Sequence, residues 1–230
     1  MTIDRRSFLL RAKHLLLGAI GLSVLSPLAR HASAAQIIVG SIVKVRGGAS
    51  LLRDGQQIVL EGGEEVAARD VITTLADSRV RIALKDGSTL NLGELTRMTI
   101  AEFEFSAETM ERKGAFDLKG GLLQAITAKA APGSSFVIRT RNAVAATRST
   151  DWIVNADKAE TSVFVLEGKV DVAESALGFR SLSSAEQDKA MLLAAGQSVV
   201  IGKMALGAEL KAQPSDNSKI AKLQAGLAFD

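Results

Sequence analysis

The sequence has 230 residues with no cysteine, no tyrosine, one tryptophan and two histidines, and its formal charge is +3. Residues 1–35 hold five of the 28 basic residues and one of the 25 acidic residues, so residues 36–230 carry 23 bases and 24 acids. The positive charge therefore belongs to the N-terminal segment. Residues 36–230 lack the basic excess that binding to DNA or RNA requires, so no nucleic-acid partner is expected.

Both histidines, His14 and His31, lie in the N-terminal segment, so the rest of the chain contains neither histidine nor cysteine. This excludes zinc, copper and iron sites built on imidazole or thiolate, Ser-His-Asp and Cys-His nucleophiles, and disulfides. No Asp-x-Asp-x-Asp-Gly loop for calcium is present. We therefore expect no cofactor and no metal site, and the side chains that remain for chemistry are carboxylates, lysines and hydroxyls.

Residues 1–35 have the layout of an export signal that is cleaved from the mature protein. A basic start is followed by the 11-residue apolar stretch Leu15–Leu25 and by the small-residue run Ala32–Ala35. This is the order of a secretory signal peptide. The apolar stretch is shorter than the roughly 20 residues that span a membrane, so no permanent membrane span is expected.

The arginine pair in this segment indicates the export route. Arg5 and Arg6, followed by Phe8 and Leu9, resemble the twin-arginine signal, which carries folded proteins across the bacterial inner membrane. An ordinary Sec signal with a basic start remains the alternative, because neighbouring positions depart from the usual twin-arginine pattern. We predict recognition by the twin-arginine export machinery and a periplasmic location.

From residue 37 onward, apolar and polar side chains alternate with the period of two that is typical of half-buried β-strands. The clearest strand is Arg79–Lys85. The Asp86-Gly87 pair that follows it predicts a hairpin, and Asp54-Gly55 predicts another. Further strands are predicted at Ile42–Val45, Val71–Thr74, Met98–Phe105, Leu122–Thr127, Phe136–Arg139, Trp152–Val154, Val163–Leu166, Val170–Val172 and Val199–Ile201.

Many short strands separated by turn signals predict an all-β fold, an antiparallel β-sandwich or β-roll. A short C-terminal helix is expected after Pro214, capped by Ser215 or Ser218 and extending through Leu223. The predicted organisation has three parts, which are the export signal at 1–35, a β domain at 36–203 and a C-terminal tail at 204–230.

Two segments 121 residues apart share a spacing pattern. Val43–Leu51 aligns with Phe164–Val172, and Leu60-x-x-Gly63-x-x-Val66 recurs as Leu193-x-x-Gly196-x-x-Val199. Duplication and chance similarity between β-hairpins both explain this pattern. Duplication predicts two similar halves packed face to face around one core. The polar segments Glu102–Lys113 and Glu174–Asp188 are expected to be exposed loops.

Five pieces of the β region occur in the order found in the FecR family of bacterial periplasmic domains, and Val43–Val172 resembles that family. They match its opening strand, its Gly-x-x-Val and Asp-x-Ile-x-Thr block, its Asp-Gly-Ser hairpin, its Arg-Gly-Thr strand and its closing strand. In this sequence these pieces are Gly40–Gly47, Leu60–Asp70 with Ile72 and Thr73, Leu84–Leu92, Thr147–Trp152 and Val165–Val170.

The sequence also departs from the family pattern. Arg69 and Ser149 stand where the family has glycine, so a turn that needs positive φ is expected to differ there. Membrane-bound members place a cytoplasmic anti-sigma segment before a spanning helix and relay an outer-membrane siderophore-transport signal to a sigma factor. About 14 residues precede the apolar stretch here, so no such segment is expected, and no cytoplasmic relay by this chain alone.

Arg148, Asp151 and Trp152 combine charge with the single tryptophan in one short strand and form the candidate interaction site. Extended geometry points Arg148 and Trp152 to one face and Asp151 to the other. Arginine and tryptophan dominate interface hot spots. The alternative is that Trp152 fills the core while Arg148 pairs with a carboxylate. Asp70 and Asp86 adjoin turns, where aspartate commonly bonds backbone N–H groups, so a catalytic pair of acids is not expected.

These features predict an exported, periplasmic, non-catalytic FecR-like domain that acts as a protein-interaction or sensory module. The expected partner is an envelope protein such as an outer-membrane transporter, or a cell-wall component, bound at exposed sheet edges. A glycan- or peptidoglycan-binding module is the alternative. Residues 36–230 hold only one tryptophan and seven phenylalanines for stacking against sugars. A carboxylate-dependent hydrolase is a remote alternative.

Overall fold

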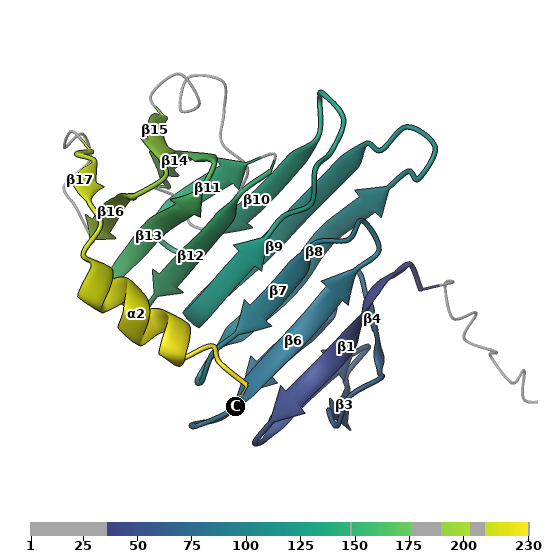
Figure 1. Cartoon of the computed structure of the whole chain (residues 1–230). Coiled ribbons are helices and arrows are strands. Elements are labelled where there is room, and N and C mark those ends of the chain that lie inside the picture. Colours follow the sequence, from purple (N-terminus) through teal and green to yellow (C-terminus); the bar gives the residue numbers. More distant parts are fainter. Residues whose placement is uncertain (1–35, 148, 176–189, 203–209, 230) are drawn as a thin grey trace, which may run out of the picture. The chain divides into compact units, whose positions relative to one another are not determined.

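The computed structural model describes residues 36–147, 149–175, 190–202 and 210–229, which form strands β1–β17 and helix α2 (Figure 1). Residues 35–230 form one compact unit. Among the described strands, β9 and β10 form a parallel pair and the other pairings are antiparallel. The prediction of an all-β, mostly antiparallel fold with a short C-terminal helix is confirmed.

The strands lie in two sheets. Sheet A contains, in spatial order, β4 (Glu65–Ala67), β1 (Ile38–Arg46), β6 (Arg79–Leu84), β7 (Thr89–Leu92), the second part of β9 (Arg112–Ile126), β12 (Asp151–Ala156), β13 (Glu160–Glu167), β16 (Gln197–Gly202) and β17 (Gln213–Pro214).

Sheet B is built from the remaining strands and shares β9 with sheet A. It contains, in spatial order, β3 (Gln56–Val59), β2 (Ala49–Arg53), β5 (Val71–Thr74), β8 (Arg97–Phe105), the first part of β9, β10 (Ser135–Arg139), β11 (Ala143–Thr147), β14 (Lys169–Glu174) and β15 (Met191–Ala194).

Strand β9 takes part in both sheets. Its residues up to Gly120 pair with β8, and its residues from Gly121 onward pair with β12. Gly121 has φ of +99°, and a Cβ atom at this position would collide with the backbone of Thr96. The crossing therefore requires glycine, because a side chain would meet both the steric penalty of positive φ and the connection between β7 and β8.

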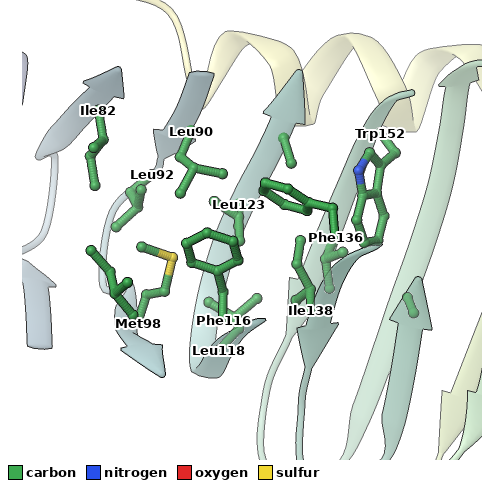
Figure 2. Close-up of a cluster of buried hydrophobic side chains, with 14 of the residues drawn as sticks. Ile82, Leu90, Leu92, Met98, Phe116, Leu118, Leu123, Phe136, Ile138 and Trp152 are labelled. Carbon is green, nitrogen blue, oxygen red and sulfur yellow. The ribbon is translucent and has the colours of Figure 1, made fainter. Parts of the chain in front are cut away.

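The inner faces of the two sheets enclose one core. Along β6, Val80, Ile82 and Leu84 are buried as the alternation predicts, while Arg79 and Arg81 face outward and are half-buried. Figure 2 shows the centre of this core, which includes Leu90, Leu92, Met98, Phe116, Leu118, Leu123, Phe136, Ile138 and Trp152.

The two similar segments of the sequence form matching structures. β1 continues into β2 at Gly47, and β13 continues into β14 at Gly168, each time from sheet A to sheet B. β1 and β2 then pair with β4 and β3, as β13 and β14 pair with β16 and β15. The halves lie at opposite ends of the same two sheets. They do not pack face to face as expected.

Helix α2 (Asn217–Ala225) packs on the outer face of sheet A (Figure 1). Its N-cap is Asp216, whose carboxylate accepts hydrogen bonds from the backbone N–H groups of Ser218 and Lys219. The expected serine caps are therefore wrong by one or two positions. A carboxylate satisfies the free N–H groups and also favours the positive end of the helix dipole.

Candidate functional site

The structure places part of the predicted interaction site. Arg148 and the export-signal residues Arg5, Arg6, Phe8 and Leu9 lie outside the described residues, as does most of the loop Glu174–Asp188. Asp151 and Trp152 are the first residues of β12, and their side chains leave opposite faces of sheet A.

Trp152 belongs to the core. Its side chain is fully buried between the sheets beside Phe136, and its indole Nε1 has no hydrogen-bond partner within the described structure (Figure 2). This position corresponds to the structural alternative for Trp152. A partner on the protein surface does not reach the ring in this conformation. Of the two predicted site residues on β12, only Asp151 is accessible from outside the sheet.

Asp151 ends a row of hydrogen-bonded side chains on the outer face of sheet A. Arg81 Nε donates to Asn91 Oδ1 at 2.8 Å, Asn91 Nδ2 donates to Gln124 Oε1 at 3.2 Å, and Gln124 Nε2 donates to Asp151 Oδ1 at 2.8 Å. The four residues come from four adjacent strands, β6, β7, β9 and β12. The polar row therefore links the two halves of sheet A through side chains as well as backbone. Sequence spacing gave no signal for it.

The environment of Asp151 disfavours its charge. Burial raises the pKa of the Asp151 carboxyl above its ordinary value of 3.8, and the neighbouring carboxylate of Glu167 raises it further, while the hydrogen bond from Gln124 acts in the opposite direction. Glu167 lies opposite Asp151 on the adjacent strand. Two acids side by side on a partly covered face form the acidic end of the polar row.

The Asp-Gly-Ser hairpin is anchored by a buried ion pair. Arg112 is 1% exposed, and its NH1 group donates to Asp86 Oδ2 at 2.5 Å, to Ser88 Oγ at 3.1 Å and to the carbonyl of Ala128 at 3.3 Å. Asp86 also accepts from Ser88 N at 2.9 Å. The guanidinium lies 5.1 Å from the ring centre of Phe136. The turn chemistry predicted for Asp86 is present, but its partner Arg112 was expected in an exposed loop.

Asp70 has a similar arrangement in the turn before β5. Arg53 donates through Nε and NH2 to the two carboxylate oxygens of Asp70, and Ala67 N donates to Asp70 Oδ2 at 2.7 Å. Asp70 is 1% exposed. The hydrogen bonds to Asp70 raise the pKa of the Arg53 guanidinium. Both aspartates singled out in the sequence are thus bound to arginine and to backbone N–H groups, and neither is presented to a substrate.

The turn before Asp70 keeps the conformation that glycine would adopt. Arg69 has φ of +75°, so the expectation that the turn differs here is wrong. The turn is held by the hydrogen bond from Ala67 N to the carboxylate of Asp70 and by the bond from Arg69 N to the carbonyl of Ile100. These contacts keep Arg69 in the left-handed region, which is strained for a residue other than glycine.

One sheet edge is open to solvent. All four residues of β3 are exposed, with Val59 at 69%, and β3 pairs on one side with β2. The N–H of Leu60 donates to the carbonyl of Ala49, and because antiparallel bonding alternates along a strand, the N–H of Val59 points away from β2. Acidic residues surround this edge, at Asp54, Glu61, Glu64 and Glu65.

The structure gives no indication of a metal centre in the part of the chain that it describes, because no three acidic, histidine or cysteine side chains gather there as ligands. In those same residues, no helix is long and apolar enough to cross a membrane.

Comparison with known proteins gives three results. Residues 70–171 match the family model described as FecR protein. Two crystal structures of a candidate anti-sigma factor from Parabacteroides distasonis ATCC 8503 are similar to the chain, at 19% and 18% identity and TM-scores of 0.49 and 0.47. Each covers 66% of this chain, which spans 62% of that protein, less than two thirds of its length. No curated protein matches.

The fold and the site define a two-sheet β domain in which the turns at Asp70 and Asp86 are held by buried or half-buried arginine–aspartate pairs. Residues 70–171, from the start of β5 to β14, form a FecR domain. The resemblance seen in the sequence is confirmed over these residues. β1–β4 and β15–β17 extend the same two sheets beyond the matched range.

Proposed function

We propose that this protein is an exported, periplasmic FecR-like module that contacts another protein of the bacterial envelope and takes part in signal transduction without catalysing a reaction. The FecR domain at residues 70–171 is the observation that carries this proposal. The partner we propose is an outer-membrane transporter or another envelope protein. Export through the twin-arginine route is part of the proposal, with residues 1–35 removed.

The arrangement of the acids supports a non-catalytic role. Hydrolysis by paired carboxylates needs two acids that both reach the substrate. Asp70 and Asp86 are instead buried and bound to Arg53 and Arg112. Removing either acid from its arginine to perform chemistry leaves a buried charge without its partner, which is strongly unfavourable.

The aromatic side chains support a protein partner over a glycan. Sugar rings stack on exposed aromatic faces, yet none of the aromatic side chains in the described residues is exposed. Trp152 and the phenylalanines 103, 116, 136 and 164 are buried, and those at 105 and 229 are half-buried. The glycan-binding alternative has no stacking surface in this part of the structure.

The edge strand β3 is the contact surface that we propose. A partner strand that pairs with β3 gains main-chain hydrogen bonds and covers Ile58 and Val59, which are 37% and 69% exposed. One edge of sheet A, by contrast, ends in β17, whose Pro214 has no N–H to donate. β3 has no proline and no lysine, so its edge is open to strand addition.

A single N–H group tests this surface. Val59→Pro removes the outward donor of β3 and keeps the bonds to β2, whereas Val59→Thr keeps the donor and changes the side chain to a similar extent. Envelope proteins are recovered by pull-down with the wild type and with each variant. We expect a protein that the wild type and Val59→Thr both recover and that Val59→Pro recovers in an amount at least tenfold lower. Equal recovery by all three folded chains would exclude strand addition at β3.

Export is tested separately. Replacing Arg5 and Arg6 together with lysine should stop export if the twin-arginine machinery recognises the pair, because this route reads the arginines themselves and Sec reads only a basic start. Unchanged appearance of the protein in the periplasm would leave Sec as the route.

A further inference from the structure

The outer face of sheet A carries an apolar strip that the C-terminal segment covers. Ile153 and Phe164 are buried on this face although they point away from the main core, and Leu227 is buried against them. Helix α2 crosses the strands β13, β12 and β9 at this level (Figure 1). Half-buried apolar residues complete the contact on both sides, at Leu122, Leu166, Ile220 and Leu223.

Cations gather where the helix ends. Arg79 Nε donates to the carbonyl of Gly226 at 2.8 Å, and Lys44 Nζ donates to the carbonyl of Phe229 at 2.9 Å. The guanidinium of Arg81 lies 4.8 Å from the ring centre of Phe229. Positive side chains at a helix C-terminus favour its partial negative charge and any anionic group that follows. The face therefore offers an apolar strip that runs toward a basic end.

The attachment of α2 is slight compared with the core. None of the nine residues of the helix is buried, and a helix of this length is not stable by itself in water. Ile220, Leu223 and Leu227 supply its apolar contacts. Elements that bury few side chains open with a small fraction of the free energy of global unfolding. α2 therefore detaches far more easily than any strand of the sandwich.

We propose that the outer face of sheet A is a docking surface for an amphipathic helix of a partner protein, and that α2 occupies it until that partner displaces it. The chemistry of α2 defines the partner helix. The partner helix carries apolar residues at positions i, i+3 and i+7, which is the spacing of Ile220, Leu223 and Leu227. It also carries acidic groups beyond its C-terminal end, and these meet Lys44, Arg79 and Arg81. This surface is separate from the β3 edge, so either can fail without the other.

A peptide with the sequence of residues 215–230 is the probe, because it holds the three apolar positions and an acidic end. Its binding to the full chain is measured by fluorescence anisotropy. Leu223→Asp in the chain releases α2 from the apolar strip, whereas Ala221→Asp puts the same charge on an exposed position of the same helix. A peptide that itself carries Leu223→Asp is the control for the probe.

The expected result is that the Leu223→Asp chain binds the peptide at least tenfold more tightly than the wild type or the Ala221→Asp chain does, and that the control peptide binds none of them. Equal affinity for the three chains would overturn the proposal. So would loss of the buried emission of Trp152 in the Leu223→Asp chain, because α2 would then be an integral part of the fold and no displaceable cover.

Discussion

The buried pair of Asp86 and Arg112 gives the sharpest test of how the FecR domain is held together. Asp86→Asn keeps the shape of the side chain but removes the charge that compensates Arg112, whose side chain is fully buried. Arg112 then stays in the core and keeps its hydrogen bonds to Ser88 Oγ and the Ala128 carbonyl, but it loses the charge of the Asp86 carboxylate.

Removing one member of a buried ion pair costs about 3–5 kcal/mol, because the remaining charge loses the opposite charge in a medium that solvates it poorly. The stability of a whole domain is about 5–15 kcal/mol, so this one change removes a large part of it. Arg112→Met combined with Asp86→Asn removes both charges. We expect the double variant to be more stable than the sum of the single effects by about 3 kcal/mol.

Urea unfolding followed through tryptophan emission measures these values, since Trp152 is the single tryptophan, is fully buried and has no tyrosine background. Asp54→Asn is the matched control, because Asp54 precedes Gly55 in the other Asp-Gly hairpin and is exposed. It should change the stability by no more than about 0.5 kcal/mol. A cost below about 1 kcal/mol for Asp86→Asn, or additive effects in the double variant, would refute the reasoning.

Three further predictions concern single positions. Gly121→Ala should destabilise the domain by about 3 kcal/mol or more in urea unfolding, from positive φ and the collision with the backbone of Thr96, while the neighbouring Gly120→Ala, whose added Cβ lies 3.7 Å from its nearest neighbour, should cost about 1 kcal/mol or less. Arg69→Gly should stabilise it by about 0.5–1 kcal/mol, because relief of positive φ outweighs the added freedom of the unfolded chain; a loss of stability would contradict this. The raised pKa of Asp151 means that the folded chain holds this proton more tightly than the unfolded chain, so its contribution to stability rises as the pH falls toward 3.8. Wild type should therefore gain stability relative to Asp151→Asn between about pH 7 and about pH 4, and a difference that does not change with pH would show that burial of this carboxyl is unimportant.

Local sequence chemistry predicted those parts of the fold that depend on neighbouring residues. The Asp54-Gly55 turn adopts positive φ at both positions, 49° and 81°, which is the geometry favoured between two hydrogen-bonded strands. The alternation in β6 placed Val80, Ile82 and Leu84 correctly. In such segments the turn type and the burial of one face leave a single register, so short-range patterns are sufficient.

The parts that were missed depend on distant partners. The segment Glu102–Lys113 was expected to be a loop because of its charges, yet its ends belong to β8 and β9, whose outward positions hold those charges. Arg112 is buried because Asp86 lies 26 positions earlier in the chain and meets it in the core. The strand Ala143–Thr147 was missed because alanine favours strands weakly, and its pairing with β10 and β14 overrides that preference.

The sequence identified residues of the candidate site but did not predict how they are arranged in the sheet. The sequence singled out Asp151 and Trp152 as neighbours, and the structure separates them onto opposite faces of sheet A. The polar row that Asp151 joins requires knowing that β6, β7, β9 and β12 are adjacent, and this order arises because β9 bends into sheet A. No pattern within one strand reports which strands become its neighbours.

The shared strand β9 also governs how the domain comes apart. One continuous backbone supplies ladder bonds to β7 and β12 in one layer and to β8 and β10 in the other. Neither layer can lose its middle strand while the other stays intact. Because β9 is the central strand of both sheets, the two sheets should unfold together in one all-or-none step.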